Sequence, residues 1–85
     1  MALDRNKVLE AAQKYLAKGN YDKAIAEYQK LYDADPKDVR TLLKIGDLYT
    51  RKGALREAIE AYMGVATAYG QTGFAQKAVA VYKQV

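Results

Sequence analysis

The chain has 85 residues, of which 51% are hydrophobic and 28% charged, and its formal net charge is +4. This length suits one domain, and the apolar content is typical of a globular protein rather than a disordered one. The sequence contains no cysteine and no histidine, which excludes disulfides, cysteine-ligated metal sites and an imidazole general base. Charged residues interrupt the first stretch, MALDRNKVLEAAQ, and no window approaches 18 apolar residues. We therefore expect no secretory signal, no membrane-spanning helix and a cytoplasmic location.

The basic residues are scattered along the chain. The longest basic run is Arg51-Lys52, and most charges alternate in sign. Nucleic-acid-binding proteins cluster lysine and arginine on one face or in runs. The pattern therefore favours a solvated surface over a nucleic-acid interface.

Apolar residues recur at helical spacing along almost the whole chain, and no strand pattern is present. Asp4 stands at the start of the first predicted helix and Asp38 at the start of the third, where a carboxylate can accept hydrogen bonds from free backbone N–H groups. Gly19 and Gly53 fit the ends of these two helices, because glycine adopts left-handed backbone at low cost. Pro36 prevents the second helix from continuing. The predicted helices span residues 4–18, 21–34, 38–52, 54–69 and 74–84.

The pattern Y-x3-G-x4-A-x3-Y occurs three times, beginning at Tyr15, Tyr49 and Tyr69. The second copy begins 34 residues after the first, and the third only 20 residues after the second. Small residues recur where paired helices would cross and need close approach, namely at Ala12, Gly46, Ala24 and Ala58. Gly64, inside the fourth predicted helix, indicates another close approach. Seven tyrosines occupy repeat positions, which favours core packing over ligand stacking, and these are Tyr15, Tyr21, Tyr28, Tyr49, Tyr62, Tyr69 and Tyr82.

The 34-residue pattern resembles the tetratricopeptide repeat. The family's small residue, tyrosine, glycine, alanine, second aromatic residue and proline occur at its spacing in residues 5–38. Residues 39–72 repeat all of these except the proline, which Gly70 replaces. In addition, Val8 and Leu42 stand where the family often has a large aromatic residue. The resemblance implies an all-α fold, in which antiparallel helix-turn-helix repeats stack as a short right-handed solenoid of about five helices. Residues 1–85 would form a single domain.

The third copy of the pattern is short by 14 residues, or about four helical turns. One hypothesis is that residues 65–85 form a shortened third repeat, whose first helix is the C-terminal part of the predicted helix 54–69. The alternative is that residues 74–84 form a closing helix whose motif is a coincidence. Because four residue types recur in one register, the pattern favours the shortened repeat.

The resemblance implies a non-enzymatic scaffold that binds a peptide or partner protein on its concave face. In the family, the first helix of each repeat lines this face, and the matching positions here mix apolar with hydrogen-bonding side chains, which suits a peptide. The predicted partner-binding residues are Asn6, Leu9, Gln13, Arg40, Leu43, Asp47, Thr50 and Arg51, with Leu16 and Ala17 beside them. The alternative is that these are ordinary solvated positions. Some family members bind the C-terminal carboxylate of a chaperone with lysines and asparagines, and these positions here are Leu9, Gln13 and Lys44. Because only Lys44 has the required charge, we do not expect this chain to bind that ligand.

No residue is predicted to be catalytic or to bind a cofactor or a metal. Asp33 and Asp35 lie beside Pro36, where capping of a turn between helices explains them. Glu57 and Glu60 lie on one predicted helix with Arg56 beside them. The glycines form no phosphate-binding motif.

The last predicted helix has an apolar arc of about 160°, which is wider than packing on one neighbour requires. A second hypothesis is therefore self-assembly of the chain as a dimer or a helical filament. Alternatively, this chain is the N-terminal module of a longer protein. Further repeats of that protein would then pack against this helix. The residues predicted for self-association are Phe74, Val79, Val81 and Val85. Nucleic acid ranks last among the partners, and no membrane partner is expected.

Overall fold

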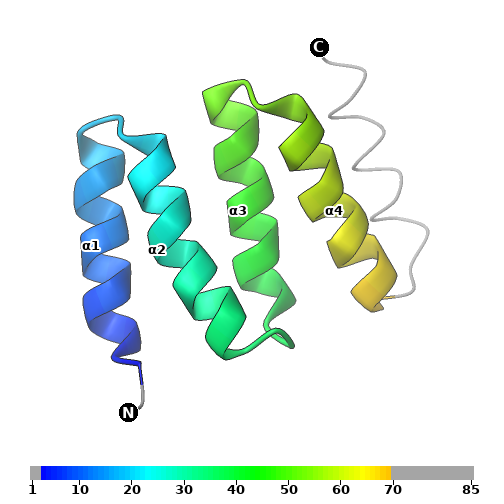
Figure 1. Cartoon of the computed structure of the whole chain (residues 1–85), viewed down its shortest axis with the longest axis horizontal. Coiled ribbons are helices and arrows are strands. Elements are labelled where there is room, and N and C mark those ends of the chain that lie inside the picture. The colour runs from blue at the N-terminus through cyan, green and yellow to red at the C-terminus, as the bar shows by residue number, and fades with distance from the viewer. Residues whose placement is uncertain (1–2, 70–85) are drawn as a thin grey trace.

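The computed structural model describes residues 3–69 of the chain, which form four helices. Figure 1 shows them as a row in which each helix runs antiparallel to the one before it. The helices are α1 (Arg5–Ala17), α2 (Tyr21–Ala34), α3 (Val39–Lys52) and α4 (Leu55–Tyr69). Residues 3–69 contain no strand, so the all-α prediction is confirmed, and the predicted bounds of these four helices agree to within one residue. The predicted helix 74–84 lies outside the described residues.

Each of the first three helices begins at a side chain that accepts a backbone hydrogen bond. Asp4, Asn20 and Asp38 accept from the N–H groups three residues later, at 3.2, 3.2 and 3.4 Å. These bonds satisfy N–H groups that have no partner within the helix. The N-caps predicted at Asp4 and Asp38 are confirmed. Asn20 is the N-cap of α2, for which no capping residue was predicted.

The ends of α1 and α3 use left-handed glycines. Gly53 follows α3 directly with a φ of +88°. In α1 the residue that follows the helix is Lys18, and Gly19 comes one position later with a φ of +72°. Both glycines therefore turn the chain back toward the next helix, as predicted, at a conformation that other residues rarely adopt.

The apolar faces of the helices meet in a core that runs along the row. Ala12, Ala24 and Ala58 are fully buried, which confirms that small residues lie where the helices approach one another. The main cluster joins α1, α2 and α3, and its buried members are Val8, Ala12, Ala24, Ile25, Tyr28, Leu31, Ile45 and Leu48. A second, smaller cluster of Ala58 and Tyr62 joins α4 to α3.

Six of the seven tyrosines that were predicted in the core lie in the described part of the chain. Tyr28 and Tyr62 are buried, and three others pack half-buried against the clusters, namely Tyr15, Tyr21 and Tyr49. Tyr69 is 43% exposed at the end of α4, so the core prediction is wrong for this residue. The helical pattern extends the apolar face to position 69, but it does not show whether a neighbouring helix covers that turn. Tyr82 lies outside the described residues.

Two glycines inside helices permit close contact between α3 and α4. A β-carbon at Gly46 would lie 3.1 Å from a ring carbon of Tyr62 and 3.3 Å from the Cβ atom of Ala61. At Gly64 it would lie 3.0 Å from the Cδ2 atom of Leu42. These separations are shorter than ordinary carbon–carbon contacts, so the close approach predicted at Gly64 is confirmed.

Replacing Gly46 by leucine should destabilise the fold by about 1–3 kcal/mol, because the side chain would overpack the contact between α3 and α4. Gly46→Ala is the matched control. There the gain in helix propensity, about 0.5–1 kcal/mol, offsets a mild clash. The free energy of unfolding would be measured by urea titration with circular dichroism. Equal stability of the two variants would contradict the packing described above.

Candidate functional site

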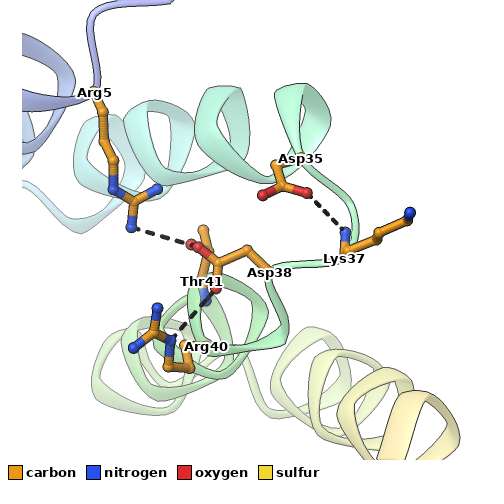
Figure 2. Close-up of polar contacts among 6 residues, drawn as sticks. All are labelled: Arg5, Asp35, Lys37, Asp38, Arg40 and Thr41. Atoms are coloured by element: carbon orange, nitrogen blue, oxygen red, sulfur yellow. Dashed lines mark hydrogen bonds and ion pairs between the residues drawn. The ribbon is translucent and has the colours of Figure 1, made fainter.

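The starts of α1 and α3, the first helices of the pairs α1–α2 and α3–α4, are linked by an ion pair. The guanidinium of Arg5, at the start of α1, approaches the carboxylate of Asp38, just before α3, with an Nη2–Oδ2 distance of 3.4 Å. Figure 2 shows Arg5 extending from one helix start toward the other. We call the outward residues of α1 and α3 together the α1–α3 face.

Asp38 links the two helix pairs through several contacts at once. Its Oδ2 atom accepts a 3.0 Å hydrogen bond from the Thr41 hydroxyl, and Arg40 lies 3.8 Å from its Oδ1 atom (Figure 2). Partial burial raises the pKa of the Asp38 carboxyl, but the two hydrogen bonds from Thr41 and the charges of Arg40 and Arg5 outweigh it. The pKa consequently lies below its ordinary value of 3.8. The side chain of Arg40 is 87% exposed, so its charge remains on the surface.

On α3, three of the residues predicted to bind a partner surround one open hollow. Asp47, Thr50 and Arg51 line a hollow of about 390 Å³, together with Lys44, Leu48 and Tyr62. Arg51 is exposed, whereas Asp47 and Thr50 are half-buried. The Thr50 hydroxyl donates a 2.9 Å hydrogen bond to the carbonyl oxygen of Gly46, one turn earlier. The hollow is therefore lined mainly by polar and charged side chains.

The remaining predicted residues divide into exposed polar and half-buried apolar positions. Asn6, Gln13 and Arg40 are exposed, as is Ala17. The half-buried leucines pack inward instead: Leu9 and Leu16 against the main cluster, and Leu43 against the cluster of Ala58 and Tyr62. These leucines therefore support the α1–α3 face from below, and its polar residues supply most of what a partner would meet.

Tyr62 reaches the hollow from α4, across the contact between the last two helices. Its hydroxyl donates a hydrogen bond to Oδ1 of Asp47. Burial of the ring and the hydrogen bond to the Asp47 carboxylate raise the pKa of Tyr62 to about 12, although a hydrogen bond with Thr50 opposes the rise. Tyr62 was predicted in the core, and the sequence pattern did not predict this contact with Asp47. The signal available was an aspartate at position 47, where the first repeat has Gln13.

The acidic residues near Pro36 form local hydrogen bonds. Asp35 accepts a hydrogen bond from the backbone N–H of Lys37 within the turn (Figure 2), and Asp33 accepts one from Gln29. Within residues 3–69, no group of three or more acidic side chains is placed to hold a metal ion. The residues predicted for self-association, Phe74, Val79, Val81 and Val85, lie outside the described residues, so that hypothesis stays a prediction.

Stability should depend on pH through Asp38. Because its pKa is lowered by folding, the stabilisation from its charge is complete above the ordinary value of 3.8 and is lost as the pH falls through the folded value. Asp38→Asn keeps an N-cap oxygen and removes the charge. The parent should therefore be more stable than the variant near neutral pH, and the difference should shrink below about pH 4, as measured by urea unfolding. Asp33→Asn is the matched control, and a difference that is constant with pH would contradict the ion pairing.

The titration of Tyr62 should depend on Asp47. Asp47→Asn removes the negative charge beside the hydroxyl, so the pKa of Tyr62 should fall from about 12 toward, but not to, its ordinary 10.0, because burial remains. The ultraviolet absorbance of tyrosinate during alkaline titration measures this change. The variant Tyr62→Phe identifies which part of the titration curve belongs to Tyr62. Identical titration curves for the parent and Asp47→Asn would show that the contact does not form in solution.

Comparison with known proteins agrees with the helix-pair architecture. A family model described as tetratricopeptide repeat matches residues 9–71, which include most of α1 and all of α2, α3 and α4. No curated protein sequence matches the chain significantly. None of the helices in the described part of the chain is both long and apolar enough to cross a bilayer. Tetratricopeptide repeats generally mediate protein–protein interaction and are typically non-enzymatic. Since the match covers most of the sequence, the chain belongs to the tetratricopeptide repeat family.

Proposed function

We propose that the chain is a non-enzymatic scaffold that binds a peptide or a partner protein on the α1–α3 face, the concave face of the repeat. One observation carries the proposal. The leucines of this face pack inward, while its polar side chains border an open hollow on α3. A surface with a packed base and outward hydrogen-bonding groups can bind a polypeptide without rearranging its core.

The chemistry of the face suits a polypeptide better than a small molecule. Small-molecule sites are mostly apolar and enclose most of the ligand. Here the hollow is open and has charged groups at Lys44, Asp47 and Arg51, and the amides of Asn6 and Gln13 are exposed on α1. A segment that crosses both helices can use backbone and side-chain hydrogen bonds along its whole length.

The domain boundaries that we propose are those of the 34-residue repeat. We infer that residues 5–38 and 39–72 are two repeats of one domain, and that residues 65–85 are a shortened third repeat. The length of α4 supports this inference, because the helix runs unbroken from Leu55 to Tyr69. Val65 and Tyr69 therefore share one helix with Ala58, as double use of this helix requires.

The location of the binding surface can be tested by nuclear magnetic resonance with a peptide selected from a random display library. On addition of the peptide, the amide signals of Asn6, Gln13, Asp47 and Thr50 should shift most, because these residues border the proposed surface. Exposed residues of the second helices, such as Lys30 and Glu60, should shift little. Shifts confined to α2 and α4 would place the partner on the opposite face and contradict the proposal.

A further inference from the structure

We propose that the outer edge of α1, which carries Lys7, Lys14 and Lys18, is a docking surface for an acidic helix of a partner protein. We call these three residues the lysine edge. Figure 1 shows α1 as the first helix of the row, with α2 on one side of it. All three lysines are exposed, so no helix in the part of the chain that the structure describes covers this edge.

The lysine edge lies opposite the side of α1 that faces the core. Ala12 is fully buried in the main cluster, which joins α1 to α2 and α3. At 100° per residue, Lys7 and Lys14 lie about 140–160° around the helix from Ala12. They also lie about 100° around the helix from Asn6 and Gln13, so the lysine edge is a surface separate from the α1–α3 face.

The equivalent edge of α3 packs against a helix. One 34-residue repeat after Lys7 and Lys14 stand Thr41 and Leu48, which are 5% and 0% exposed. Leu48 belongs to the main cluster together with Tyr28 of α2. The two first helices of the repeats are therefore alike in backbone at this edge, but α3 is covered there by α2, whereas α1 has lysines in place of the threonine and the leucine. The edge of α1 thus has a shape that suits a helix and a different chemistry.

That chemistry selects an acidic helix over an apolar one. A helix with an apolar face, packed on α1 as α2 packs on α3, would cover the ammonium groups of Lys7 and Lys14 without offering them a partner, which is unfavourable. Carboxylates on the incoming helix remove this cost and favour association. Between the two lysines, one turn from each, Ala11 is half-buried, and its small side chain lets a helix approach closely.

The charges of the edge form a line that has no partners within residues 3–69. None of the three lysines is in an ion pair there, whereas Lys30 pairs with Glu27 and Lys52 with Asp22. The lysine edge spans eleven residues, so its three charges extend over about 17 Å and fall within about 40° of one another. A partner helix with carboxylates four and seven residues apart has the matching spacing.

The arrangement favours a helix over a nucleic acid. A phosphate backbone has a charge at every nucleotide, so it gains most from a continuous basic surface. The lysine edge is a single line of charges, interrupted by Ala11 and flanked by the carboxylate of Glu10. A helix can place its own carboxylates only where the lysines lie and an apolar side chain against Ala11.

The experiment is a selection from a display library of random 18-residue helical peptides. Peptides that bind the parent chain are counter-selected on the variant Lys7→Gln/Lys14→Gln/Lys18→Gln, so that only those that need the lysine edge remain. They should be enriched in aspartate and glutamate at spacings of four and seven residues. Their affinity for the variant should be about tenfold lower or more, since three surface ion pairs are lost. Replacing their acidic residues by amides should weaken binding to the parent by a similar factor.

The matched control is Lys23→Gln/Lys30→Gln/Lys37→Gln, which removes the same charge from three other exposed lysines. Its affinity for the selected peptides should remain close to that of the parent, and circular dichroism of all variants would establish that they fold. In nuclear magnetic resonance spectra of the parent, the peptides should shift the amide signals of the lysine edge, and the signal of Thr50 on the α1–α3 face should move little.

The outcomes separate this inference from the proposed function. If no peptide depends on the lysine edge, or if those that do lack acidic enrichment, the inference is wrong and the proposed function stands. Peptides whose signals map to the α1–α3 face would contradict the inference and support the proposed function. An equal loss of affinity in the control variant would show that net charge alone governs binding, which also overturns the inference. Binding of a twelve-nucleotide oligothymidylate that needs the lysine edge, with no acidic peptide selected, would assign the edge to nucleic acid instead.

Discussion

The structure depends on how closely its helices can approach one another. At Gly46 the space that a β-carbon would need is already used by Tyr62 and Ala61, and Ala12 and Ala24 are fully buried in the first pair. Close packing at small residues lets larger side chains fill the space beside each crossing. Because Tyr62 packs against Gly46, its hydroxyl reaches Asp47 on the outward side of α3. The contact that holds α3 to α4 thus also shapes the hollow.

Polar contacts between the helix pairs lie at both ends of the helices. At one end, Arg5 of α1 meets Asp38 before α3, and at the other, Lys52 of α3 pairs with Asp22 of α2. Such exposed ion pairs contribute little stability individually, typically 0–1 kcal/mol. Asp38 contributes more than a surface charge, because it also caps α3 through Thr41. These contacts favour one alignment of the pairs, and the apolar core supplies most of the energy that holds them together.

The face that we propose for binding combines two layers with different functions. Leu9, Leu16 and Leu43 face inward and keep α1 and α3 in place. Asn6, Gln13 and Arg51 are exposed to solvent, so replacing them need not disturb the core. This division explains how one helical framework can serve many partners, since the residues that build it differ from those that select a ligand. In this chain equivalent outward positions differ in charge between the two repeats, with Glu10 in the first and Lys44 in the second.

The sequence by itself determined the four helices of residues 3–69, because their apolar periodicity, the caps at Asp4 and Asp38, and the left-handed Gly53 are local signals. It also determined that Ala24 and Ala58 are buried, since a 34-residue recurrence of small residues has a packing cause. Only the tertiary structure decided that Leu43 supports the core, that Tyr69 is exposed, and that Tyr62 reaches across to Asp47. These outcomes depend on which neighbouring helix covers each side chain, and contacts between residues distant in sequence are not encoded in the periodicity of either helix alone.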